Sequence, residues 1–226
     1  MLRLDDLLLS VAIGLAVVPV SLAASEVVDE ALPDKVTIKA GYFDNDFKPL
    51  SDTTLPSTVP FRVRLIPGSL SGPVDDTTAL FEFPLTMGES KTLDLAEVRP
   101  TLKRLAARLT SEGANAGLVV TPSSTRFARF ATDVAYPGTD RGIGGTTFHG
   151  SRPNETLLMV YFDRRCQVVG VFHGRTAIVT YNVNIAQPGV HLLSLVRESP
   201  TSVQVNVTAL PLPLILSVVP STVGRR

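Results

Sequence analysis

The feature that most constrains the fold is an alternation of apolar and polar residues in the C-terminal half of the chain. In residues 177–185 and 203–209, apolar side chains occupy every second position, and the residues between them are mostly polar and uncharged. Successive side chains of a β-strand point to opposite faces, so each segment predicts a strand with one buried and one solvent-facing side. Shorter copies of the same pattern occur at residues 36–40 and 61–65.

Two further segments are apolar on both faces, and turn residues separate the candidate strands. Residues 157–162 and 168–172 have no polar face, which is typical of central strands that are covered on two sides. Pro67-Gly68, Pro137-Gly138 and Pro188-Gly189 each place glycine where a type II turn requires a positive φ.

The short links between strands indicate the fold class. From residue 156 onward, candidate strands follow one another closely, which favours antiparallel pairing. We therefore predict a mainly β fold, an antiparallel β-sandwich of immunoglobulin-like or jelly-roll-like type. The chain has one cysteine and no tryptophan, so the Cys and Trp marks of true immunoglobulin domains are missing. No known family is matched closely enough to name.

One segment has the period of a helix instead. Leu102, Leu105, Ala106 and Leu109 lie at helical spacing, which predicts an amphipathic helix near residues 100–112. Pro100 suits the first turn, and Gly113 suits the position after the last one. We expect this helix to cap an open end of the sandwich.

The N-terminus resembles a secretory leader. Residues 7–20 are almost entirely apolar, and residues 21–23 carry small side chains at both positions that a signal peptidase reads. We predict a signal peptide at 1–23 and a secreted or periplasmic protein with no stable membrane span after cleavage. Asp5 and Asp6 are unusual in a leader, so an uncleaved membrane anchor is the alternative.

The remaining residues, 24–226, are predicted to form a single domain, and the alternative is a break at 137–155 into two small domains. The formal net charge is zero, from 21 basic and 21 acidic residues. Residues 24–100 hold 13 acidic and 7 basic groups, whereas residues 101–226 hold 6 and 13. Nucleic-acid binding needs basic groups on one face with aromatic residues among them, whereas the basic groups of this chain are scattered, mostly in turns and on one predicted helix, so we expect no nucleic-acid partner.

The segment DRGIGGTTFHG, residues 140–150, is the candidate ligand site. It lacks the lysine of a phosphate-binding Walker loop, and it lacks the third glycine and the helix of a dinucleotide fingerprint. We therefore expect no cofactor. A Gly-rich loop over the whole of 137–155 is unusually long for a compact domain, and such loops are often functional. The ligand-binding candidates are Arg141, Gly144, Gly145, His149 and Arg152.

No local motif identifies a catalytic or metal site. Residues 68–72 have the glycines of a nucleophile elbow but leucine at the nucleophile position. His149, His173 and His191 are too far apart in sequence for a local zinc motif. Asp44 and Asp46 have a calcium-like spacing, but the residues that follow do not continue an EF-hand loop, so a turn is expected.

Cys166 is interpreted as a structural residue that opens a strand. As the only cysteine, it has no partner for an internal disulfide. Arg164 and Arg165 precede it directly and would favour a reactive thiolate, which is the alternative interpretation.

These observations favour a non-catalytic exported binding or structural module of the cell envelope or exterior. Its partner would be an envelope or extracellular protein or a glycan. Two alternatives remain. In an exported hydrolase, His149 or His173 would meet an acid and a nucleophile beside the 137–155 loop. In a self-assembling homo-oligomer, the apolar tail at 209–226 would pair with another copy.

Overall fold

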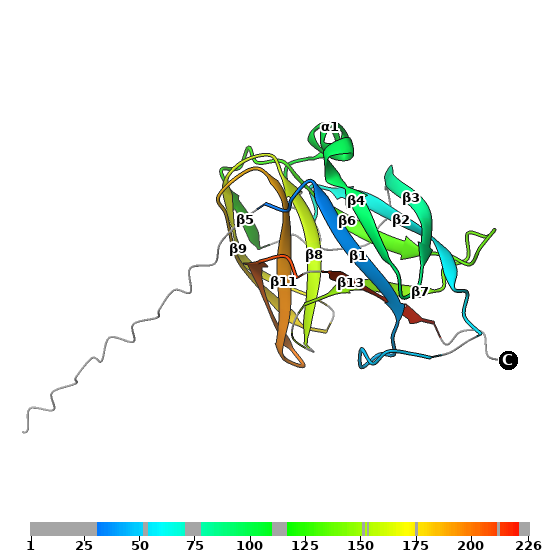
Figure 1. The fold of residues 1–226 in the computed structure, drawn as a ribbon. Helices are drawn as coiled ribbons and strands as arrows, with labels where there is room; N and C mark the ends of the chain where they lie inside the picture. Colours follow the sequence, from blue (N-terminus) through cyan, green and yellow to red (C-terminus); the bar gives the residue numbers. More distant parts are fainter. Residues whose placement is uncertain are drawn as a thin grey trace, which may run out of the picture.

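A computed structural model describes residues 31–51, 54–70, 78–109, 117–150, 152, 154–174, 176–211 and 213–221. Within these residues the protein is mainly β, as predicted, with one short helix (Figure 1). The predicted leader lies outside the described residues. The elements are β1 (Lys35–Tyr42), β2 (Thr58–Pro67), β3 (Thr78–Thr86), β4 (Ser90–Asp94), α1 (Leu95–Leu105), β5 (Leu118–Thr121), β6 (Phe127–Val134), β7 (Gly144–His149), β8 (Glu155–Phe162), β9 (Cys166–His173), β10 (Ile178–Ile185), β11 (Gly189–Ser199), β12 (Ser202–Thr208) and β13 (Leu214–Pro220).

The described strands form one large, mostly antiparallel sheet that branches at β8. The main path runs β4-β1-β13-β7-β8-β11-β12-β10-β9-β5. One edge of β8 pairs with β11 along its whole length. The other edge is divided, because its first residues pair with β7 and its last residues pair with β6, which leads on to β2 and β3. Two pairs, β1 with β13 and β10 with β12, are parallel.

β8 separates two hydrophobic cores. Leu157, Met159 and Tyr161 point into the larger core, which also receives side chains from β1, β2, β6, β13 and α1. Val160 and Phe162 point the opposite way into a second core, between β8 and β11 on one side and β5, β9, β10 and β12 on the other. Figure 1 shows β8 in the middle of the molecule, between these two groups of strands. The prediction that residues 157–162 are covered on both faces is confirmed.

The alternating segments form strands with one buried face, as predicted. Val205 and Val183 are fully buried in the second core, whereas their neighbours Asn206 and Asn182 are exposed. The prediction that residues 168–172 are covered on both faces is wrong, because Val171 is 41% exposed and β9 has one solvent-facing side. No strand covers that side of β9 within the described part of the chain.

All three glycines of the Pro-Gly pairs have positive φ, at 62° for Gly68, 73° for Gly138 and 148° for Gly189. Gly189 is the first residue of β11, and its φ is far from the type II value of about 80°, so the type II prediction is wrong there. Gly68 has little space for any other residue, because a Cβ there would collide with the carbonyl oxygen of Arg108. The turn after β2 therefore requires glycine for both its conformation and its packing.

The helix begins earlier than the periodicity predicts. α1 starts at Leu95 because the Asp94 carboxylate accepts a hydrogen bond from the Ala96 N–H at 3.0 Å and caps the first turn. Pro100 therefore lies inside the helix rather than at its start. The helix ends at Leu105 because the backbone of Ala107 pairs with Phe127, which draws the chain into the sheet.

The C-terminal tail does not form an edge strand. β13 lies between β1 and β7, and both of its edges are hydrogen-bonded within the chain. Pro213 precedes the strand and Pro220 ends it, so neither proline interrupts the ladder. Pairing of β13 with a second copy by strand addition would therefore require displacement of β1 or β7.

Replacing Val205 by Asp should unfold the protein. The side chain is fully buried in the second core, and an unpaired carboxylate there costs about 4 kcal/mol or more, comparable with the whole stability of a domain. The matched control is Asn206→Asp on the adjacent, exposed position, which should change the free energy of unfolding by less than about 0.5 kcal/mol. Urea unfolding followed by circular dichroism measures both. Equal effects of the two substitutions would contradict the described faces of β12.

Candidate functional site

The glycine-rich segment is not a single loop. Residues 144–149 form β7, which pairs with β13 over six residues and with the start of β8. A Cβ at Gly144 would collide with the backbone of Val219, so this glycine allows the close approach of β7 and β13. The expectation of an unbroken loop from 137 to 155 is wrong, because glycine at a close strand contact and glycine in a loop are indistinguishable by composition.

The connection between β1 and β2 lies against β7. Its first part, residues 43–50, is named here the 43–50 connection. Asp44 organises it, since one carboxylate oxygen accepts hydrogen bonds from the N–H groups of Asp46 and Lys48 at 2.9 and 2.8 Å. The turn predicted for this segment is confirmed. Phe47 has a φ of 60°, a left-handed conformation that is strained for an aromatic residue.

Phe47 covers His149 at the end of β7. The two ring centroids lie 4.1 Å apart in an edge-to-face arrangement, and the Phe43 ring lies 5.5 Å from the same imidazole. Nε2 of His149 is hydrogen-bonded to the Ser217 hydroxyl on β13. Burial by these neighbours lowers the pKa of His149, because an imidazolium would lose hydration there.

The His149–Ser217 pair does not make a catalytic dyad. Ser217 is fully buried, so a substrate cannot reach its hydroxyl without opening the sheet. Among the described residues no carboxylate lies within 4.0 Å of a ring nitrogen of His149 or His173. His173 is exposed at the hairpin between β9 and β10. The nucleophile, base and acid that a hydrolase needs are therefore not brought together by these two histidines.

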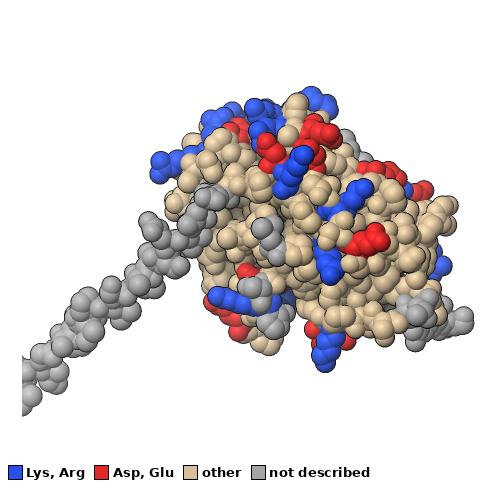
Figure 2. Space-filling view, viewed as in Figure 1, with Lys and Arg blue, Asp and Glu red and all other residues tan. Residues whose placement is uncertain are grey.

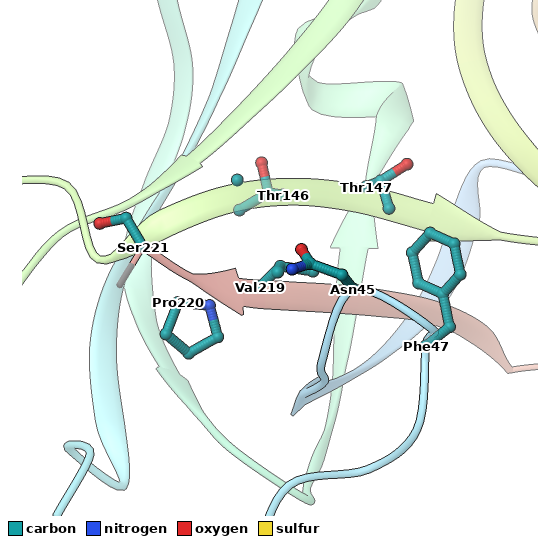
Figure 3. A pocket seen from close by; sticks show the side chains of 8 residues that line it. Asn45, Phe47, Thr146, Thr147, Val219, Pro220 and Ser221 are labelled. Carbon is teal, nitrogen blue, oxygen red and sulfur yellow. The ribbon is translucent and has the colours of Figure 1, made fainter. Parts of the chain in front are cut away.

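The 43–50 connection separates two grooves. The first groove has a volume of about 450 Å³ and is lined by Asn45, Phe47, Thr147, Val219, Pro220 and Ser221, with further contributions from β7. Figure 3 shows Asn45 and Phe47 over β13 and beside β7, with Phe47 next to Thr147 at one end and Ser221 at the other. No charged side chain lines this groove among the residues that the structure describes.

The second groove, of about 520 Å³, lies on the other side of the same connection. It shares Asn45 and Phe47 with the first groove and continues over Asn154, Thr156 and Arg197. Among the residues that the structure describes, Phe47 is the aromatic side chain that lines both grooves.

The predicted ligand residues do not gather into one site. Gly145 lines the first groove, and His149 lies beneath Phe47. Arg141 instead places its guanidinium over the Tyr136 ring, 5.6 Å from the centroid. The Arg152 N–H donates to the Glu155 carboxylate at 3.3 Å. Arg141, His149 and Arg152 therefore do not form a joint binding site for an anion.

Glu155 is buried at the start of β8. One of its oxygens accepts a hydrogen bond from the Ser194 hydroxyl on β11, and the other accepts from Arg152 N–H. A Cβ on Gly150 would collide with the carboxylate. Gly150, the last residue of the 140–150 segment, therefore makes room for a buried polar group.

Comparison of the chain with protein-family models, with curated proteins and with solved structures finds no match. Within the described ranges, no three His, Cys, Asp or Glu side chains lie close enough to hold a metal ion. The single described helix is too short to cross a membrane. Function is therefore inferred from the geometry of the grooves.

Acidification should destabilise the protein through His149. Its folded-state pKa is lowered, so the unfolded chain binds more protons as the pH falls below the ordinary histidine value of about 6.5. Stability is thus lost as the pH falls from about 7 toward the folded-state pKa, and below that pKa the loss is complete because both states are protonated.

The measurement is the thermal unfolding midpoint of the native protein and of His149→Gln between pH 5 and 8. The variant should show a smaller loss on acidification, whereas the exposed control His173→Gln should keep the native profile. Identical profiles for all three proteins would exclude His149 as the titrating group.

Replacing Gly150 by Ala should destabilise the protein by about 1–3 kcal/mol, because it displaces the buried Glu155 carboxylate from its hydrogen bonds. Gly145→Ala is the control, since a Cβ there has nothing within 4 Å and the backbone is not in the left-handed region. Chemical denaturation compares the two. A larger effect at Gly145 would show that the local packing differs from this description.

Proposed function

We propose that the protein is a non-catalytic binding module of the cell envelope or exterior and that its ligand lies in the first groove. The observation that carries this proposal is the uncharged lining of the groove around the Phe47 ring. Concave sites with an aromatic wall and a few neutral hydrogen-bonding groups are typical of small-molecule and oligomer binding.

The ligand class that fits this lining is a neutral glycan. The C–H face of a sugar ring packs on an aromatic ring, and its hydroxyls exchange hydrogen bonds with amide and hydroxyl groups. Phe47 supplies the ring, and Asn45, Thr147 and Ser221 supply the polar groups. The aromatic surface is small, because the chain has no tryptophan and Phe47 acts alone. We therefore expect modest affinity.

The second groove lengthens the site. Because Asn45 and Phe47 line both grooves, a ligand of several sugar rings that passes over the 43–50 connection would contact Asn154 and Thr156 as well. The backbone strain at Phe47 supports the same proposal. Residues in strained, left-handed conformations cluster at functional sites, and Phe47 lines both grooves.

The proposal includes a fold type and a location. The larger core receives side chains from β1 and β13 and from β2 and β6, which supports a sandwich of immunoglobulin-like or jelly-roll-like type. Export to the periplasm or exterior is supported by the sequence of residues 1–23, which lie outside the described part. The burial of Ser217 weighs against the hydrolase alternative.

The test is titration of the protein with neutral oligosaccharides of four to six hexose units, followed by saturation-transfer NMR and calorimetry. At least one oligosaccharide should bind saturably and remain chemically unchanged. Phe47→Ala should weaken binding by about tenfold or more, which corresponds to about 1.4 kcal/mol for the loss of one stacking contact.

Leu50→Ala is the matched control, because Leu50 is a 40% exposed apolar residue of the same connection and lines neither groove. It should leave the affinity within about twofold. Absence of binding across the panel, equal losses in both variants, or cleavage of the oligosaccharide would each refute the proposed function.

A further inference from the structure

Figure 1 shows α1 at the end of the molecule opposite the 43–50 connection. Basic side chains gather at this end. Figure 2 shows blue side chains over α1 and over the strand ends beside it. The group comes from α1 and the residues after it, from the residue directly before β6 and from the turn between β8 and β9. We call it the basic end; its members, all exposed, are Arg99, Lys103, Arg104, Arg108, Arg126, Arg164 and Arg165.

Hydrogen bonds between these segments show that they lie together. The Arg126 guanidinium donates to the carbonyl oxygen of Arg104 at 3.3 Å. The Arg126 N–H donates to Asp163 at 2.9 Å, and Arg164 donates to the same carboxylate at 3.1 Å. The folded chain thus brings side chains up to 66 positions apart in sequence, from Arg99 to Arg165, to one end.

Within the part of the chain that the structure describes, the acidic groups near the basic end are fewer than its basic groups. Asp34 pairs with Arg99, and Asp163 pairs with Arg164. Lys103, Arg104 and Arg165 form no ion pair within the described residues. Asp94 is engaged as the cap of α1, which leaves Glu97 as the exposed acidic side chain of the helix. Among the described residues, the basic end therefore carries more basic than acidic side chains.

The chain enters the described structure beside these groups. Ala31 and Leu32 line a pocket of about 220 Å³ together with Arg99, Lys103 and Tyr161. Ten residues separate Ala31 from the apolar run at 7–20, and a fully extended chain of that length spans at most about 36 Å. Whenever that run lies in a bilayer, the basic end lies within this distance of the membrane surface.

We propose that the basic end docks on an anionic phospholipid surface. Each Lys or Arg beside a surface rich in anionic lipid strengthens binding about fivefold, and this attraction requires no shaped pocket. The unpaired groups are long, flexible side chains spread over one end, without the aromatic residues that stack on nucleic-acid bases among them. The proposal is independent of the groove, which lies at the other end of β1.

The test is flotation of the purified protein with vesicles of phosphatidylcholine containing 30% phosphatidylglycerol and with vesicles of phosphatidylcholine alone. The protein should bind the anionic vesicles preferentially and lose this preference in 0.5 M NaCl. The triple charge reversal K103E/R104E/R165E should weaken binding to anionic vesicles by about 100-fold or more, with an unchanged melting temperature.

The matched control is K39E/K48E/K91E, which reverses three exposed lysines away from α1 and changes the net charge equally. It should weaken binding by less than about fivefold, and Phe47→Ala should not change it. All variants share the same N-terminus, so any contribution of residues 7–20 cancels. Equal losses in both triple variants, binding to both vesicle types alike, absence of binding, or tighter binding to heparin than to vesicles would overturn the proposal.

Discussion

The interaction on which the structure depends is the burial of both faces of β8. One face of the strand belongs to each core, and β11 continues the same wall, with Leu192 in the larger core and Leu193 in the second. A strand in this position has no solvent-facing side, so every residue from 157 to 162 is apolar or aromatic. The two cores are therefore coupled through β8. A shift of its pairing register by one residue would move every side chain of the strand from one core to the other.

The divided edge of β8 also positions the groove. Since β6 occupies the end of that edge, β7 pairs with β8 only at its start, where His149 faces Thr156. The end of β7 is thus close to the exit of β1, and the 43–50 connection folds over the imidazole. The grooves lie on either side of that connection, so they follow from the pairing of β8 rather than from a local motif.

The sequence pattern predicts those elements whose structure depends on neighbouring residues and on exposure to solvent. The alternation at 177–185 and 203–209 predicts strands with the correct buried faces, because the solvent on one side imposes a period of two. β7 is not predicted from the sequence, because its strand conformation depends on hydrogen bonds to β13 and β8 rather than on a local pattern. The start of α1 is set by Asp94, an N-cap residue that the sequence displays but that apolar spacing alone does not reveal. Phe47 carries no sequence signal that separates it from an ordinary turn residue.

β1 sets the relation between the two proposed surfaces. Asp34, directly before β1, pairs with Arg99 of the basic end, and Phe43, directly after it, contacts His149 beneath the first groove. Asp34 and Phe43 flank the eight residues of this extended strand and therefore lie about 30 Å apart. A rigid strand of that length means that a protein docked through its basic end holds the groove away from the lipid. The proposed glycan-binding groove would then face away from the membrane surface.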